Sequence, residues 1–259
     1  MADGSCILLT RGSTVPATMP VRAEADEPRR PHRSPAVLVR AGVLLAMLAG
    51  LAALTSRTGD RWLCDVDARI SSLVARRRGT AVIRAAHAVS ALAEPAAVAA
   101  PLAAATVLAI QKDGWHAAFK PFGTVITGMA VRRGLSRMIA RPRPPAANWL
   151  IAPEGFSLPS KHTTLAALTA GACALGVGAG PHASDRAVLV AASGIGASRI
   201  CLGVHWPSDV LAGWLFAAAW LDVVRALPAR DQRSRRWPGV DKYEPSTASG
   251  GLLTGRTGQ

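Results

Sequence analysis

Six apolar segments, separated by charged residues, run through the central part of this chain of 259 residues. The first is long enough to cross about 30 Å of hydrocarbon as a helix. Several of the others are rich in Ala and Gly, which suits close packing of helices in lipid. The pattern therefore predicts an all-α integral membrane bundle of about six transmembrane helices, with five to seven compatible. The expected helices cover residues 36–55, about 91–110, 115–131, 163–180, 187–202 and 210–224.

The regions outside these segments have a different pattern. Residues 65–76 alternate apolar and polar positions at helical spacing, which predicts a helix lying at the membrane interface. Residues 1–34 are polar and rich in Pro, Arg and Glu, with no apolar stripe, and residues 229–259 are basic and then rich in Gly, Ser and Thr. We expect both to be disordered tails around a membrane domain at 35–228. Arg40, near the start of the first segment, can reach the interface with its long side chain.

Composition supports a membrane protein. Half of the residues are hydrophobic and only 18% are charged, against about 25% in a typical soluble domain. This excludes a disordered acidic or a fibrous protein and disfavours a soluble enzyme. The net charge of +14 suits a nucleic acid, an anionic membrane surface or a phosphate-bearing substrate. Nucleic acid is the weakest of these because aromatic residues are not interleaved with the basic ones.

The distribution of arginine predicts the orientation in the membrane. Both flanks of the bundle, 22–40 and 225–236, are rich in arginine, and an even number of helices places both on the cytoplasmic side. The basic loop 56–80 argues the other way, and we attribute its charge to the interfacial helix. The chain is then an integral membrane protein, expected in a bacterial plasma membrane.

Three clusters of polar residues adjoin the apolar segments, and with six helices all three fall on one face, the extracytoplasmic one. They are RRGLSRMIARPRP at 132–144, Pro159-Ser160-Lys161-His162, and Ser198-Arg199-x5-His205-x3-Asp209. Arginines at a membrane boundary are also common anchors, and Pro-Ser before a helix is also a common cap. Arg199 is harder to explain structurally, because an ionisable residue inside an apolar helix marks a functional site by default.

Together these residues suit phosphoryl chemistry. Cations, a hydroxyl and a helix N-terminus make a cradle for a tetrahedral oxyanion. Two histidines allow one to attack and the other to protonate the leaving group. A carboxylate four residues after His205 can hold its ring and fix its tautomer. No acidic or cysteine ligand cluster is present, so we expect no metal site and no cofactor.

These blocks resemble the type 2 phosphatidic acid phosphatase family, which shares its core with the vanadium-dependent haloperoxidases. The family pattern is K-x6-R-P, P-S-G-H and S-R-x5-H-x3-D. The third block matches in full, and the second has Lys161 in place of glycine. The first matches as Arg143-Pro144, with Ser136 at the lysine position; the alternative register, Arg141-Pro142, places Gly134 there. The resemblance covers roughly residues 35–226.

The resemblance implies a role for each matching residue. His205 would be the nucleophile that forms a phosphohistidine, with Asp209 orienting it, and His162 would be the general acid. The residues that would hold the phosphoryl oxygens are Arg143, Arg199, Ser160, Ser198 and Lys161, the last through its backbone amide.

The resemblance also implies a substrate class. We expect hydrolysis of a lipid phosphate or diphosphate: polyprenyl diphosphate, phosphatidylglycerol phosphate, phosphatidate or a prenyl-linked sugar phosphate. The expected partners are thus this substrate and membrane lipids. A haloperoxidase-like vanadate enzyme and a catalytically weakened protein that binds phospholipid headgroups are the alternatives. The sequence leaves the oligomeric state and the particular lipid open.

Overall fold

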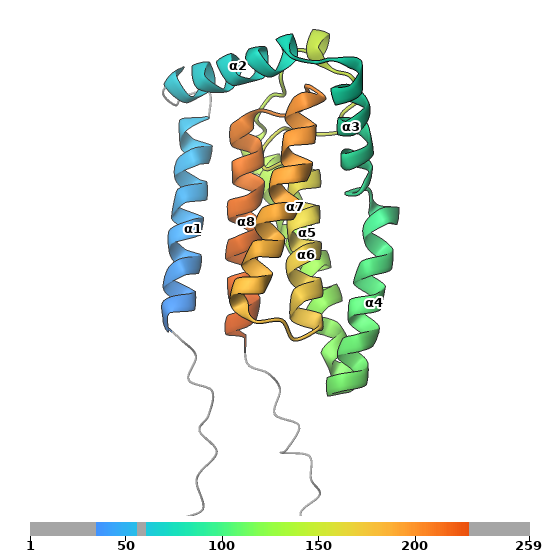
Figure 1. The fold of residues 1–259 in the computed structure, drawn as a ribbon. Helices are drawn as coiled ribbons and strands as arrows, with labels where there is room; N and C mark the ends of the chain where they lie inside the picture. The colour runs from blue at the N-terminus through green and yellow to red at the C-terminus, as the bar shows by residue number, and fades with distance from the viewer. Residues whose placement is uncertain (1–34, 56–60, 228–259) are drawn as a thin grey trace, which may run out of the picture. The chain divides into compact units, whose positions relative to one another are not determined.

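The computed structural model describes residues 35–55 and 61–227 of the chain (Figure 1). These residues form eight α-helices and two short 3-10 helices, joined by loops. No strand occurs among these residues. The helices are α1 (Pro35–Leu54), α2 (Arg61–Arg76), α3 (Thr80–Ala91), α4 (Pro95–Asp113), η1 (Trp115–Ala118), α5 (Phe119–Ile139), η2 (Ala146–Asn148), α6 (Lys161–Gly176), α7 (Pro181–Cys201) and α8 (Pro207–Ala226).

The expected all-α membrane bundle is confirmed, but the count of six helices is not. Each predicted segment contains a helix, namely α1, α4, α5, α6, α7 and α8, and the expected interfacial helix is α2. The prediction missed α3, which is short and directly precedes α4. Pro95 begins α4, because a proline is accommodated in the first turn of a helix and ends the one before it. By length and composition, three of the described helices, α1, α4 and α8, could each cross a membrane. The tails predicted at 1–34 and 229–259 lie outside the described residues.

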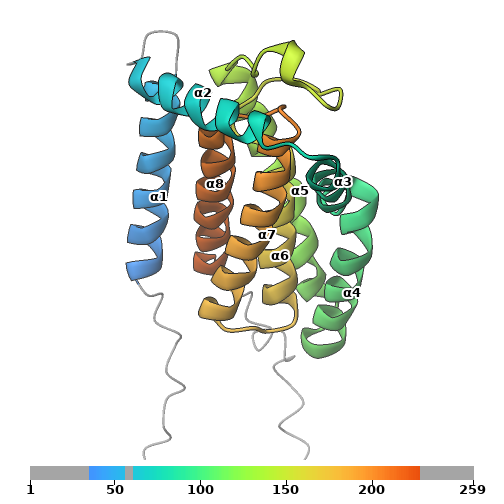
Figure 2. The same cartoon turned by 45° about the horizontal axis from the view of Figure 1, so that its top comes forward.

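Helix α6 lies at the centre of the bundle, in contact with α4, α5, α7 and α8 (Figures 1 and 2). Leu168 is fully buried on α6, together with Leu215 and Phe216 of α8. Small residues allow this close approach. A Cβ at Gly171 would lie 2.3 Å from Leu221 Cδ1, and one at Gly196 would lie 2.2 Å from Val210 Cγ1. The Gly-rich segments that look weakly hydrophobic are therefore the ones that form the core.

Helix α2 runs across one end of the bundle, which we call the α2 end (Figure 2). It contacts α7 and α8. Most of its positions are exposed or half-buried, but the side chain of Asp67 is buried with only 1% of the residue exposed. A buried carboxylate on an amphipathic helix requires partners, and its partners belong to the candidate site described below.

A cluster of ion pairs joins α1, α7 and α8 at the opposite end. Arg40 donates to the fully buried Asp222 at 2.6 Å and to Asp185 at 2.6 Å, and Arg225 donates to Asp222 at 2.8 Å. Arg40 therefore forms ion pairs within the bundle. It is also half-exposed, as expected of an arginine at the membrane interface. The beginning of α1 and the end of α8 lie together at this end, away from α2 (Figure 1).

Candidate active site

All three polar clusters meet at the α2 end. The end of α5 and the loop after it approach the beginning of α6, because Arg132 donates two hydrogen bonds to the Pro159 carbonyl. The beginning of α6 approaches α8 through a bond from Ser160 N–H to the Asp209 carbonyl at 3.1 Å. The fold thus brings together residues that are up to 77 positions apart in sequence, from Arg132 to Asp209.

His205 occupies the short loop between α7 and α8 and is buried, with 1% exposed. The loop turns at Gly203, whose φ is +77° and where a Cβ would lie 2.0 Å from the Asn148 carbonyl oxygen, so only glycine fits. The two ring nitrogens face groups of opposite charge. Nδ1 lies 3.4 Å from Oδ2 of Asp209, and Nε2 lies 3.1 Å from Nη1 of Arg143.

The surroundings of His205 keep its ring neutral. Burial lowers the pKa of His205 from 6.5 to about 4; the carboxylate of Asp209 opposes this, and the nearby cations of Arg143 and Arg199 add to it. At neutral pH the ring therefore carries one proton. A proton on Nδ1 meets the carboxylate and leaves a lone pair on Nε2, which is the arrangement that a nucleophile needs.

Asp209 is held by more groups than the sequence motif indicates. It is fully buried at the third position of α8 and accepts a bond from the N–H of Trp206 at 2.8 Å, as an acidic residue at this position often does. Ser157 donates its hydroxyl to the same oxygen, and Arg141 donates to the other at 2.6 Å. The orientation of the carboxylate is thus fixed from three sides.

Arg141 links Asp209 to α2. Its guanidinium donates to Asp67 at 2.7 Å and to the Ser208 hydroxyl at 2.7 Å, and the Ser208 N–H donates to Asp67 at 2.9 Å. Burial alone would lower the pKa of Arg141, but the carboxylates of Asp209 and Asp67 raise it above its usual value. Arg141 is therefore committed to a buried ion-pair network.

Arg143 lies beside His205 instead. Its guanidinium donates to the carbonyls of Val204 at 2.7 Å, Gly155 at 2.9 Å and Glu154 at 2.7 Å. Burial lowers the pKa of Arg143, against the opposing carboxylate of Asp209. Of the two registers that the sequence allows for the first block, the structure places Arg143 next to His205 and Arg141 behind Asp209.

The other predicted site residues lie around this pair. Arg199 is buried and donates to the Ser90 hydroxyl at 2.7 Å, and its Nε is buried without a hydrogen-bond partner among the described residues. Ser198 donates its hydroxyl to the Ile195 carbonyl within α7 at 2.7 Å. Ser160 is fully buried where α6 begins and accepts a bond from Thr163.

His162 lies in the first turn of α6 and faces the beginning of α4. Its Nε2 is 3.1 Å from Oε1 of Glu94, the residue just before α4. Its Nδ1 is buried and, within the described part of the chain, has no hydrogen-bond partner. Burial and the nearby cation of Arg199 lower the pKa of His162, and the carboxylate of Glu94 opposes this shift. When the ring is protonated, Nδ1 is the nitrogen left to donate.

Four residues of this arrangement were not singled out by the sequence analysis as functional. Asp67, Ser90 and Glu94 come from α2, α3 and the residue before α4, and Ser157 comes from the loop between α5 and α6. The available signals were weak: Glu94 interrupts an apolar segment, and Asp67 belongs to an amphipathic one. Their role depends on where the helices pack, which no local pattern states.

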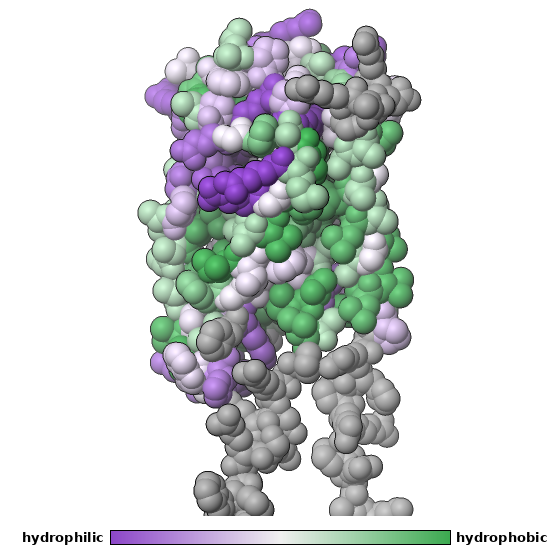
Figure 3. Space-filling model, turned by 180° about the vertical axis from the view of Figure 1, so that it is seen from behind, coloured by the Kyte–Doolittle hydropathy of each residue, from purple (hydrophilic) through white to green (hydrophobic). Residues whose placement is uncertain are grey.

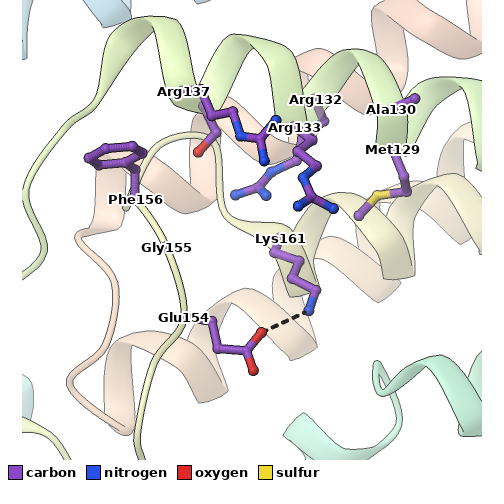
Figure 4. Close-up of a pocket in the computed structure, with 10 residues that line it drawn as sticks. Met129, Ala130, Arg132, Arg133, Arg137, Glu154, Gly155, Phe156 and Lys161 are labelled. Carbon is purple, nitrogen blue, oxygen red and sulfur yellow. Dashed lines mark ion pairs between the residues drawn. The ribbon is translucent and has the colours of Figure 1, made fainter.

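A basic pocket of about 580 Å³ adjoins the site (Figure 4). Four cations line it together with one carboxylate, a serine and apolar side chains. The lining side chains include Arg132, Arg133, Arg137, Lys161, Glu154, Ser136, Met129, Ala130 and Phe156. Ser136, at the position of the family lysine, therefore shares this pocket with Lys161, and Lys161 lies 3.6 Å from Glu154.

Comparison with known proteins agrees with this fold. Residues 117–233 match the PAP2 superfamily. The structure is similar to the crystal structure of a transmembrane PAP2 type phosphatidylglycerolphosphate phosphatase from Bacillus subtilis, with a TM-score of 0.62, 22% identity and coverage of 71% of this chain and 94% of that one. No curated protein matches the sequence. The matched region includes all the predicted site residues, and Asp67, Ser90 and Glu94 lie before it. Residues 117–233 therefore resemble the PAP2 superfamily in sequence, and the chain shares the fold of this transmembrane PAP2 type protein.

Proposed function

We propose that this protein is a phosphatase that hydrolyses a lipid phosphate or diphosphate through a phosphohistidine on His205. One observation carries the proposal: the buried ring of His205 has Asp209 at one nitrogen and the cation of Arg143 at the other, 3.4 and 3.1 Å away. A nucleophilic nitrogen beside a cation is suited to an incoming phosphate, because the same cation attracts the phosphoryl oxygens.

In the first step, the lone pair of Nε2 attacks phosphorus. The P–N bond forms as the bond to the leaving oxygen breaks, and His162 donates its proton to that oxygen. The positive charge that develops on the His205 ring is stabilised by Asp209. The contact of 3.4 Å is longer than a good hydrogen bond, and contacts of this kind tighten in the reacting complex.

In the second step, water attacks the phosphohistidine. His162, now neutral, accepts a proton from the water, the P–N bond breaks, and inorganic phosphate leaves with His205 restored. Arg143, Arg199, Ser160, Ser198 and the Lys161 amide are the proposed ligands of the phosphoryl oxygens. The described residues hold no group of three or more His, Cys, Asp or Glu side chains that could bind a metal, so we assign charge neutralisation to these cations.

The test is phosphate release by the purified protein from a panel of lipid monophosphates and diphosphates, with and without a chelator. We expect release from at least one class in the presence of chelator, and inhibition by vanadate, which mimics the pentavalent phosphorus centre. A folded protein that releases phosphate from no member of the panel would contradict the phosphatase. Activity lost to chelator and restored by magnesium would contradict the metal-independent mechanism.

The rate should depend on pH in a way that reports the buried ring. His205 attacks only when neutral, and its pKa is about 4 instead of 6.5. We therefore expect kcat/KM to stay high as the pH falls through 6.5 and to fall only near pH 4, where His205 becomes protonated. Arg143→Met should move this loss to higher pH, because Arg143 lowers the His205 pKa. A loss centred at 6.5 and unmoved in the variant would contradict the assignment.

The site is proposed to open on the extracytoplasmic face, because Arg40 and Arg225, the described arginines of the two basic flanks, lie at the other end of the bundle. Single cysteines placed at Ala147, in the exposed loop at the α2 end, and at His182, exposed at the other end, test this in a background without native cysteines. A membrane-impermeant thiol reagent added to intact cells should label position 147 and spare 182. The reverse pattern would refute the orientation.

Lys161 is proposed to supply the positive charge that the family pattern supplies with a lysine at the position of Ser136. Lys161 and Ser136 line the same pocket, so a cation lost from α5 is replaced from α6. A charge-assisted contact with a phosphoryl oxygen contributes about 1.5–3 kcal/mol, so Lys161→Gly should slow turnover about ten- to hundred-fold. Adding Ser136→Lys should restore much of this loss. Turnover by the double variant that is no faster than that of Lys161→Gly would show that the two positions do not share the phosphate.

A further inference from the structure

The basic pocket contains more positive charge than one phosphate cradle uses. Arg132 is held by the Pro159 carbonyl, and Lys161 is within ion-pair distance of Glu154. Arg133 and Arg137 are exposed, and within the described part of the chain neither meets a carboxylate. In Figure 4 the arginines extend from α5 toward the segment that carries Lys161, whose amine turns to Glu154.

The pocket and the nucleophile share one wall. The segment 154–156 lines the pocket, and its backbone carbonyls accept hydrogen bonds from Arg143. The same guanidinium contacts Nε2 of His205. Lys161 lies between Ser160 and His162 in the chain. The pocket is therefore connected to His205 through the segment 154–156 and the Arg143 side chain.

One face of α5 changes from apolar to basic toward this pocket. Phe122 and Ile126 are 54% and 53% exposed, and positions 130, 133 and 137 continue the same face at steps of three or four residues. Met129, Ala130 and Phe156 add apolar surface to the pocket itself. The view from behind the bundle shows a similar change, with hydrophilic residues gathered near the α2 end above a broad apolar band (Figure 3).

We infer that the pocket binds a second phosphate group of the lipid substrate through Arg133 and Arg137, with the lipid tail along the apolar part of α5. The substrates favoured are then lipids with two phosphate groups, a diphosphate or a phosphodiester with a terminal phosphate, over lipids with one. The inference rests on the proposed phosphatase and names its substrate class. The same chemistry could come from the headgroup of a neighbouring anionic lipid, which the experiment separates.

The experiment compares a prenyl diphosphate with the prenyl monophosphate of the same chain length, both in nonionic micelles. The wild type should show a higher kcat/KM for the diphosphate. Loss of one such arginine contact lowers affinity about ten-fold or more, so Arg133→Gln/Arg137→Gln should lower the diphosphate-to-monophosphate ratio by at least about ten-fold. Arg186→Gln, an exposed arginine at the other end of the bundle, is the matched control and should keep the ratio.

Binding of inorganic diphosphate, measured by calorimetry in the same micelles, tests the pocket without turnover. The double variant should bind it about ten-fold or more weakly than the wild type, and Arg186→Gln should bind it equally well. Tight binding that is lost in the double variant, in a protein that cleaves neither lipid, would support the pocket and refute only the proposed phosphatase. Equal binding by all three proteins, or an unchanged ratio in the double variant, would overturn the inference.

Adding phosphatidylglycerol to the micelles separates the two sources of phosphate. If the pocket binds the second phosphate of the substrate, the anionic lipid should compete and lower the diphosphate preference of the wild type. A rise in monophosphate turnover that depends on phosphatidylglycerol, and is absent from the double variant, would assign the pocket to a neighbouring lipid and overturn the inference.

Discussion

Replacing His205 by alanine is expected to abolish phosphate release, by at least about a thousand-fold, while the protein still inserts and folds. The variant removes the only protein atom proposed to form a bond to phosphorus, and activated nucleophiles commonly account for effects of this size or larger. His205 is buried, so alanine also leaves a cavity. His205→Asn is therefore the matched variant, because it fills most of the space with a polar side chain that is no nucleophile.

The covalent intermediate gives the same prediction a direct readout. Wild-type protein mixed rapidly with phosphate-labelled lipid and quenched in alkaline detergent, where a P–N bond survives, should carry label on a histidine. Both variants at position 205 should carry none. Asp209→Asn should be impaired less than His205→Ala, because the ring survives with poorer orientation. Label on His205→Ala, or turnover close to that of the wild type, would end the assignment of the nucleophile.

The helices were predictable because their signal is local. An apolar segment long enough for a membrane shows itself in any window, and all six segments contain helices. Helix α3 was missed because it is short and carries Arg84 and His87. It has only 12 residues, too few to cross a membrane, and it packs against α7. The Ala- and Gly-rich segments are only weakly hydrophobic, but their small residues let α6 approach its neighbours.

The site was predictable only where spacing along one element decides geometry. His205 lies two residues before α8 and Asp209 is the third residue of α8, so this short stretch of chain brings them together. The choice between Arg141 and Arg143 did not follow. Helix α5 ends at Ile139, and Ala140 adopts a left-handed conformation with φ of +49°, so the helical period no longer applies to either arginine. Only the tertiary fold shows which one meets His205.

Contacts from the first half of the chain were beyond sequence reasoning for a similar reason. Glu94 meets His162 and Ser90 meets Arg199 across 68 and 109 positions. The end of α3 and the residues just after it thus contact two predicted site residues, His162 and Arg199. Neither residue belongs to a motif, because a positioning contact only requires that some suitable group be present at that place in space.

The second large effect is expected from Arg141, because it is the only cation bonded to both Asp67 and Asp209 among the described residues. These carboxylates are 1% and 0% exposed. Removing one partner of a buried ion pair costs about 3–5 kcal/mol, since the remaining charge stays buried. Arg141→Met should therefore lower the free energy of unfolding by about that amount. The measurement is denaturant or thermal unfolding in detergent, with the exposed Arg133→Met as the matched control, expected to change stability by less than about 0.5 kcal/mol.

A second substitution separates the loss of charge from the loss of packing. Asp67→Asn keeps an oxygen for the Ser208 N–H but removes one of the two carboxylates that Arg141 neutralises. The double variant Asp67→Asn/Arg141→Met should therefore be more stable than Arg141→Met alone, by about 1–2 kcal/mol, which is a typical coupling energy between charged neighbours. Its phosphatase activity should stay low, because Asp209 still lacks the guanidinium that orients it. If Asp67→Asn instead makes Arg141→Met less stable, the cost arises from lost packing between α2 and α8, and the two carboxylates are not what Arg141 is needed to neutralise.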